Sequence, residues 1–175
     1  DKKTKQRIDY LKNFGFANET TVMAPGINSK MNEMQAALGL LQLKHHQENI
    51  EKRRQIADLY VNELQNLKGI TLHKIHTDMG NYNYSYFPVY IDEKELGKTR
   101  DQLYFYLREN NIFGRRYFYP LISDFPAYRG LDSALSENLP VAHNLTQRVI
   151  CLPIYSDLKN TEVKFICKTI KKFSV

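Results

Sequence analysis

Arginine and aromatic side chains lie next to one another in "RRYFYPL", residues 115–121. Cations interleaved with Tyr117, Phe118 and Tyr119 can stack on a base or bind a phosphate. The flanking sequence predicts a strand, whose side chains alternate between two faces, so half of this set is expected in the core. The segment is therefore a hypothetical site for a nucleotide-sized ligand.

A second candidate lies in "GINSKMNEMQAALGLLQL", residues 26–43, where a polar loop is joined to an apolar helix. Asn28 lies just before the expected helix N-terminus, where free N–H groups and the macrodipole favour an anion. A simpler interpretation is that Asn28 or Ser29 caps this helix, and these features favour the cap. Both interpretations stay open.

Other patterns of catalytic residues do not occur in the sequence. It has no G-x-S-x-G elbow, no P-loop and no G-x-G-x-x-G. His45 and His46 are adjacent, and no Cys/His set has zinc spacing, so no metal site is expected. Cys151 and Cys167 lie in apolar surroundings and outside any C-x-x-C, which predicts buried, reduced thiols and indicates a cytoplasmic protein.

The composition is that of a soluble protein with a packed core: 175 residues, 42% hydrophobic, mean hydropathy −0.52. No apolar run approaches the roughly 20 residues needed to cross a bilayer, and the start lacks the apolar core of a signal peptide. The net charge of +6 comes from dispersed Lys and Arg, which argues against nucleic-acid binding. The chain begins with Asp1 inside an expected helix, so we expect it to be a piece of a longer protein.

The first part of the chain is expected to be helical. Residues 3–14 predict a short amphipathic helix. Residues 30–68 keep helical spacing with Gly39 as their one Gly or Pro, which predicts one very long helix or two nearly continuous ones broken near 45–49. Gly69 is the expected C-cap. A helix this long more often bridges two domains, or a domain and a partner subunit.

The second part alternates strands and helices. Strands are predicted at 70–76, 81–92, 112–121 and 149–155, and helices at 98–111, 140–147 and 158–173, the last capped by Asn160 or Thr161. The predicted fold class is α+β: long helices followed by a small, mainly antiparallel sheet with helices on one side.

Several stretches together resemble the DegT/StrS-type PLP-dependent nucleotide-sugar aminotransferases. They are "LKNFGF" (11–16), "GINSKMNEMQAALGLLQL" (26–43), "KRRQIADLY" (52–60), "RRYFYPL" (115–121) and "VICLPIYSDL" (149–158). Their order and spacing are family-like over nearly the whole chain. The resemblance implies a fold-type-I aminotransferase with an α/β large domain that carries pyridoxal phosphate. Residues 1–30 would be the tail of that domain, 31–68 the linking and interface helices, and 69–175 the C-terminal small domain.

The resemblance also implies roles for individual residues. Asn28 matches the asparagine of the family's G-x-N-x-R element, which contacts the cofactor phosphate of the neighbouring subunit in a homodimer. Lys30 stands where the family usually has arginine; it keeps the charge but loses the planar fork. The positions where family members line the nucleotide-sugar pocket are Arg115, Arg116, Tyr117 and Tyr119. Many relatives have a histidine shortly after the proline, whereas here Pro120 is followed by Leu121, so the resemblance implies a subgroup with different sugar recognition.

The function implied is transfer of an amino group, with glutamate as donor, to a keto carbon of a dTDP-linked deoxysugar in amino-sugar and polysaccharide biosynthesis. The Schiff-base lysine would lie upstream, so no catalytic residue is expected in this chain, which is expected to be inactive alone. The alternatives are a stand-alone dimerisation module, a nucleic-acid binder that uses residues 115–119, and a lysine-less dehydratase or regulatory relative.

Overall fold

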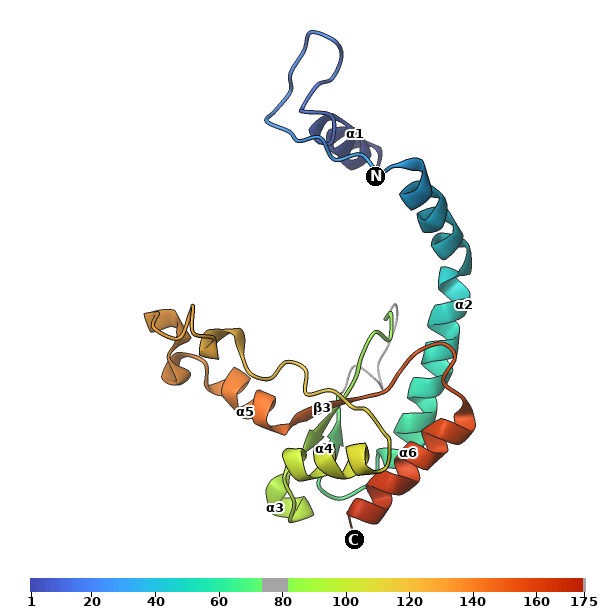
Figure 1. Ribbon diagram of the computed structural model, residues 1–175, viewed down its shortest axis with the longest axis vertical. Coiled ribbons are helices and arrows are strands. Elements are labelled where there is room, and N and C mark those ends of the chain that lie inside the picture. The colour runs from blue at the N-terminus through green and yellow to red at the C-terminus, as the bar shows by residue number, and fades with distance from the viewer. Residues whose placement is uncertain (74–81, 175) are drawn as a thin grey trace. The chain divides into compact units, whose positions relative to one another are not determined.

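A computed structural model describes residues 1–73 and 82–174 of the chain (Figure 1). The chain divides into two compact units, Asp1–Gln47 and Glu48–Val175. Within the described residues, no helix is long and apolar enough to cross a membrane, and no three His, Cys, Asp or Glu side chains are grouped so that they could hold a metal ion.

The first unit begins with α1 (Lys2–Leu11), which is shorter than the predicted helix at 3–14. Asp1 caps this helix, because its carboxylate accepts a hydrogen bond from the Thr4 amide at 2.9 Å. The following loop folds back on the end of α1 through backbone hydrogen bonds, in which the Ile27 amide donates to the Leu11 carbonyl at 2.9 Å. These bonds fix the loop that precedes the long helix.

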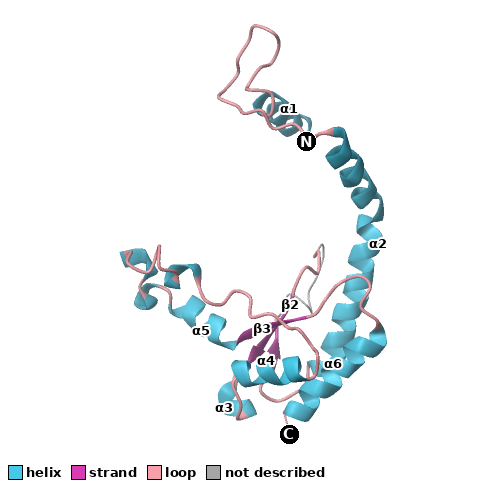
Figure 2. Ribbon diagram, viewed as in Figure 1, coloured by secondary structure: helices cyan, strands magenta, loops and turns pink. Residues whose placement is uncertain are grey.

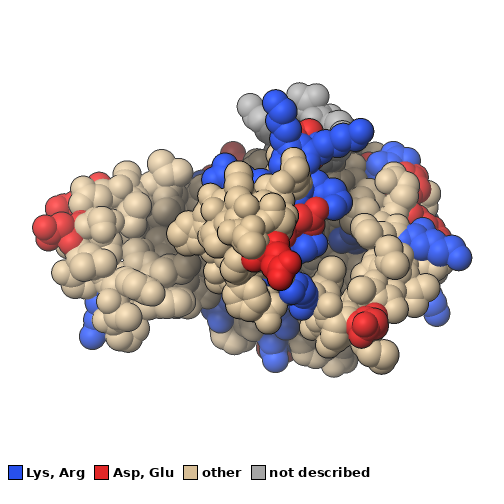
Figure 3. Space-filling model, turned by 90° about the horizontal axis from the view of Figure 1, so that it is seen from above, with Lys and Arg blue, Asp and Glu red and all other residues tan. Residues whose placement is uncertain are grey.

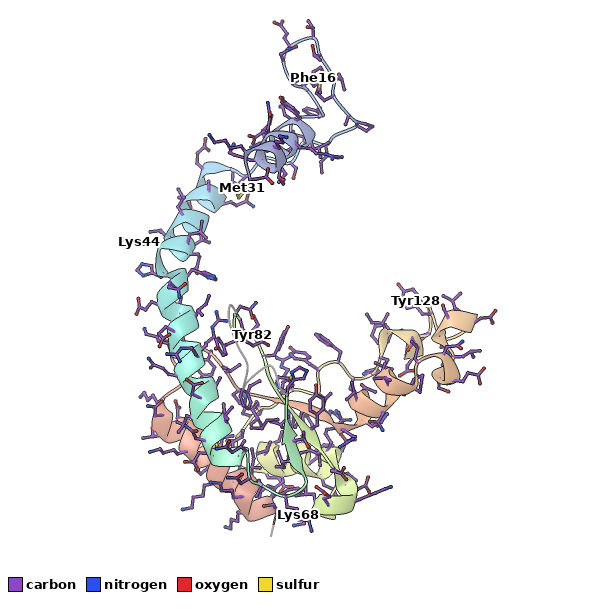
Figure 4. All side chains as sticks on the ribbon, turned by 180° about the vertical axis from the view of Figure 1, so that it is seen from behind. Phe16, Met31, Lys44, Lys68, Tyr82 and Tyr128 are labelled. Atoms are coloured by element: carbon purple, nitrogen blue, oxygen red, sulfur yellow. The ribbon has the colours of Figure 1, made fainter. Side chains whose placement is uncertain are left out.

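The long helix α2 (Glu33–Leu64) is continuous, so one helix rather than two occupies this part of the chain. Asn32 caps it: its side chain accepts from the Gln35 amide at 2.9 Å, and the Gln35 side chain accepts from the Asn32 amide at 3.2 Å. The expectation that Asn28 or Ser29 is the cap was wrong, since the helix begins several residues later. Figure 4 marks Met31 just before this helix and Lys44 within it.

The two ends of α2 differ in burial although both keep helical spacing. Near its C-terminus the buried side chains are Ile56, Ala57, Tyr60 and Leu64. Near its N-terminus the apolar side chains are exposed, among them Met34, Leu38 and Leu41. The sequence pattern therefore predicted the helix along its whole length, but its apolar face is buried only near the C-terminus.

The second unit contains a three-stranded antiparallel sheet in the order β1 (Ile70–Leu72), β2 (Phe87–Ile91) and β3 (Val149–Leu152) (Figure 2). Phe87 lies opposite Leu152, and Val89 lies opposite both Ile150 and Leu72, so these side chains share one face. This face forms the core with α2, and the ring of Tyr60 lies 4.8 Å from that of Phe87.

Helices complete the second unit: α3 (Glu93–Leu96), α4 (Arg100–Glu109), α5 (Pro140–Arg148) and α6 (Asn160–Phe173). Short 3-10 turns η2, η3 and η4 span Ile122–Asp124, Asp132–Ala134 and Ser136–Asn138. The inward residues expected on the last helix, Val163, Ile166 and Ile170, are buried. Its cap is Lys159 rather than Asn160 or Thr161, since the Lys159 amide donates to Glu162 at 2.8 Å. The α+β fold class is confirmed.

All four predicted strands are shorter than expected or absent. The strand predicted at 149–155 ends at Leu152. The strand predicted at 70–76 ends at Leu72, with residues 74–76 outside the described part, and the strand predicted at 81–92 is reduced to Phe87–Ile91. Residues 112–121 form no strand. Within this segment, Arg115 alone pairs with β3, opposite Cys151. The Phe118 carbonyl accepts a hydrogen bond from the Thr146 hydroxyl at 2.7 Å and not from the backbone of a strand.

Candidate functional site

A pocket of about 590 Å³ opens in the second unit between α4 and the segment that follows it. Two lining residues come from α4, and the others from the segment that pairs with the edge of β3. The lining residues are Tyr104, Arg108, Phe113, Gly114, Arg115, Arg116, Tyr117 and Tyr119. The structure therefore brings together Arg115, Arg116, Tyr117 and Tyr119, the four residues of this segment that the sequence predicted.

Gly114 permits this close approach of the segment to β3. A Cβ atom at Gly114 would lie 3.2 Å from the Cys151 carbonyl oxygen and 3.2 Å from the Ile150 side chain. Next to it, Arg115 and Cys151 exchange backbone hydrogen bonds of 2.9 and 2.7 Å. The pocket wall is thus anchored to the sheet at one residue pair and leaves the sheet directly after it.

Arg116 is held by a carboxylate and two rings. Its Nη1 donates to Asp101 Oδ1 at 3.0 Å. Its guanidinium carbon lies 4.3 Å from the centre of the Tyr104 ring and 5.2 Å from that of Tyr119, in the range of cation–π contacts. Arg116 therefore has a carboxylate partner and two aromatic neighbours within the chain.

Arg108 and Arg115 line the same pocket but differ from Arg116 in their partners. Within residues 1–73 and 82–174, neither has a carboxylate oxygen within 4.0 Å. Arg108 donates to the Tyr104 hydroxyl at 3.1 Å and lies 5.2 Å from the Phe113 ring centre, and Arg115 lies 5.8 Å from that of Tyr117. Two exposed, uncompensated guanidiniums on aromatic surfaces can bind a dianionic group such as a diphosphate.

Aromatic rings continue from this wall to Tyr86, the residue that precedes β2. Tyr117 stacks on Phe118 with 5.0 Å between ring centres and meets Tyr86 edge to face at 5.3 Å.

Behind the wall, burial raises the pKa of the Cys151 thiol to about 11, while a backbone hydrogen bond from Tyr117 acts in the opposite direction. This thiol is accordingly protonated at neutral pH and does not act as a nucleophile.

Asn28 and Lys30 lie in the first unit, in the loop between α1 and α2. The backbone on both sides of Asn28 is fixed, since the Phe14 amide donates to Ile27 at 3.1 Å and the Ser29 amide donates to Lys12 at 3.0 Å. The Asn28 side chain is exposed, and the Lys30 ammonium lies 6.0 Å from the centre of the Phe14 ring. This loop presents one amide and one cation on a fixed backbone.

The sequence analysis missed the contribution of α4 to the pocket. Tyr104 and Arg108 are four residues apart and thus share one helix face. That spacing is visible in the sequence and could have indicated a second functional face on this helix. On the surface shown in Figure 3, Lys and Arg lie in several places with Asp and Glu among them.

Comparisons with known proteins agree with the fold and with the resemblance. Residues 1–171 match the model of the DegT/DnrJ/EryC1/StrS aminotransferase family. The chain is 53% identical over 170 residues to a dTDP-4-amino-4,6-dideoxy-D-glucose transaminase of Escherichia coli, covering 97% of this chain and 45% of that protein. It is 37% identical to a transaminase of the same name from Shigella dysenteriae, covering 98% and 46%.

Among solved structures, DesI in the presence of its TDP-sugar product superposes with a TM-score of 0.79 at 30% identity, covering 99% of this chain and 43% of that one. DesV of S. venezuelae superposes with a TM-score of 0.83 at 24% identity, which supports the fold. The chain thus spans less than half the length of these relatives. The chain belongs to the DegT/DnrJ/EryC1/StrS aminotransferase family.

Proposed function

We propose that this chain is the C-terminal part of a PLP-dependent aminotransferase that acts on a dTDP-linked keto-deoxysugar with glutamate as amino donor. The observation that carries the proposal is the pocket between α4 and residues 113–119 in a chain of this family. Two of its arginines have no carboxylate partner among the described residues and lie beside tyrosine rings. The dTDP group is suggested by the names of the two similar transaminases.

The pocket residues would bind and orient the nucleotide part of the substrate. Arg108 and Arg115 would bind the diphosphate, since their charges are uncompensated among the described residues. Tyr117 and Tyr119 would provide the stacking surface for the base, and Arg116 would support this surface from its place between two tyrosine rings. Lys30 would contribute a further positive charge to substrate binding.

Asn28 would bind the phosphate of PLP. An exposed side-chain amide on a backbone that is hydrogen-bonded on both sides fits a phosphate oxygen as an N–H donor. When bound, PLP supplies the electron sink for transfer of the amino group. None of the lysines of this chain is proposed to bind the cofactor, so the chain by itself would be inactive. The proposed organisation is a PLP-domain tail (1–30), interface helices (31–68) and a small domain (69–175) in a cytoplasmic homodimer.

The proposal is tested first by an intact mass of the purified protein after incubation with PLP and borohydride reduction. A mass well above 20.6 kDa with one pyridoxyl group attached supports the aminotransferase. A full-length protein that takes up no pyridoxyl group contradicts it and favours the lysine-less dehydratase or regulatory relative.

Asn28→Ala in the full-length protein tests the cofactor assignment. Loss of one hydrogen bond to a charged phosphate, worth about 1.5 kcal/mol, should raise the dissociation constant for PLP about tenfold. Ser29→Ala, at the adjacent exposed position, is the matched control and should change it less than about twofold. Equal PLP affinity in Asn28→Ala and the unchanged protein would refute the role of Asn28.

A further inference from the structure

Arg100 is an unusual residue because it is almost completely buried. It is 2% exposed and is the first residue of α4. Arginine is rarely buried without partners, and the positive end of a helix dipole disfavours a cation at this position. Its placement therefore requires compensating contacts.

The guanidinium of Arg100 joins three elements. Its Nε donates to Asp101 Oδ1 at 2.7 Å, and its Nη1 donates at 2.9 Å to each of the Thr146 and Val149 carbonyl oxygens. These contacts connect the start of α4 with the end of α5 and the start of β3. A lysine cannot make this set, because a single ammonium lacks the planar fork of donors.

Two of the three partners of Arg100, Asp101 and Thr146, also contact the segment that lines the pocket. Asp101 Oδ1 accepts a second hydrogen bond from Arg116 at 3.0 Å. The Thr146 hydroxyl donates to the Phe118 carbonyl at 2.7 Å. Arg100 itself lies under Tyr119, with its guanidinium carbon 4.8 Å from the ring centre. Three independent links thus run from one buried side chain to residues 116–119.

We propose that Arg100 is a positioning residue that holds residues 116–119 in the conformation that receives the nucleotide sugar. This inference rests on the proposed function, because it takes the pocket as the substrate site. Arg100 touches no substrate in this account. It acts through Asp101, Thr146 and the ring of Tyr119.

The chain offers a matched control in Arg148. Its Nε donates to the Ile91 carbonyl at 2.9 Å and its Nη2 to Asp92 at 3.2 Å, so it also joins α5 to the sheet. Neither of these hydrogen bonds reaches residues 116–119. Arg148→Met therefore reports the effect of losing an arginine bridge without loss of the proposed positioning.

The experiment compares Arg100→Met, Arg100→Lys and Arg148→Met in the full-length protein by steady-state kinetics and by hydrogen exchange of a peptide covering residues 113–121. We expect Arg100→Met to raise KM for the dTDP-sugar about tenfold or more, to leave KM for glutamate within about twofold, and to increase exchange in this peptide. Arg100→Lys should be intermediate in both, and Arg148→Met should change neither.

An unchanged KM for the sugar together with unchanged exchange in Arg100→Met would overturn the inference, as would equal changes in Arg148→Met. If Arg100→Met does not fold, Asp101→Asn replaces it; this side chain is 43% exposed, and the variant should increase exchange in the same peptide. If the unchanged protein does not turn over dTDP-sugars, the proposed function fails, and hydrogen exchange alone decides whether Arg100 positions the segment.

Discussion

Removing either uncompensated arginine of the pocket should weaken binding of dTDP to the full-length protein. The variants are Arg108→Met and Arg115→Met, which keep most of the aliphatic side chain and remove the guanidinium. Both arginines line the pocket beside aromatic rings and have no carboxylate partner among the described residues. A diphosphate would therefore meet charges that no other group of the described chain neutralises.

The size of the effect follows from the exposure of these two side chains. A hydrogen bond to a charged group contributes about 1.5–3 kcal/mol, and exposed ion pairs lie at the low end or below because of screening. Both guanidiniums are exposed, so about 1.5 kcal/mol is the appropriate value for each, which corresponds to a roughly tenfold higher dissociation constant. If the two act separately, their double variant should lose roughly a hundredfold.

Isothermal titration of dTDP measures these dissociation constants directly. The matched control is Arg129→Met, since Arg129 is exposed, carries the same charge and lies between η2 and η3 outside the set that lines the pocket. It should change the dissociation constant less than about twofold. The differences should also shrink at about 1 M salt, where the screening length falls to roughly 3 Å.

Two results would refute this reasoning. If Arg129→Met weakened dTDP binding as much as Arg108→Met, the effect would be one of net charge and not of a site. If both pocket variants bound dTDP as tightly as the unchanged protein, the diphosphate would bind elsewhere, and the assignment of the pocket would be wrong.

Two further predictions concern the core of the second unit. Tyr60→Phe removes the hydroxyl that donates to the Pro153 carbonyl at 3.0 Å and keeps the ring against Phe87. The free energy of unfolding measured in urea should therefore fall by about 1 kcal/mol. An unchanged value would mean that water replaces this hydrogen bond. Burial raises the pKa of Cys151 to about 11 and that of Cys167 to about 12 from 9.0, so both thiols should resist iodoacetamide at pH 8 until the protein unfolds. The unfolded thiols lose their protons at lower pH than the folded ones, so the free energy of unfolding should decline as the pH rises from about 9 towards 11–12. A Cys151→Ala/Cys167→Ala variant should lack this part of the pH dependence.

The long helix shows how far local sequence predicts structure. Spacing alone predicted helix through Met34, Leu38 and Leu41 as well as through Ala57, Tyr60 and Leu64, and α2 contains both sets. Burial differs because the second set meets the sheet and α6, whereas the first set has no buried contacts within the first unit. Periodicity defines an apolar face, but the partner of that face depends on tertiary structure.

The pocket segment shows the opposite case, where a wrong local prediction hid the arrangement of the arginine and tyrosine side chains. Alternation in residues 112–121 favoured a strand, and a strand would place Arg115 and Arg116 on opposite faces. In the structure the segment pairs with β3 at Arg115 and then turns away, because its next contacts are with α4 and α5.

As a result, Arg115, Arg116, Tyr117 and Tyr119 all line one pocket, where they meet Tyr104 and Arg108 of α4. The segment contacts Arg100, Asp101 and Thr146, which lie outside it in the sequence. No local pattern contains that information. Four lining residues of the pocket were therefore predictable from seven neighbouring letters, while their common orientation depends on a buried arginine elsewhere in the fold.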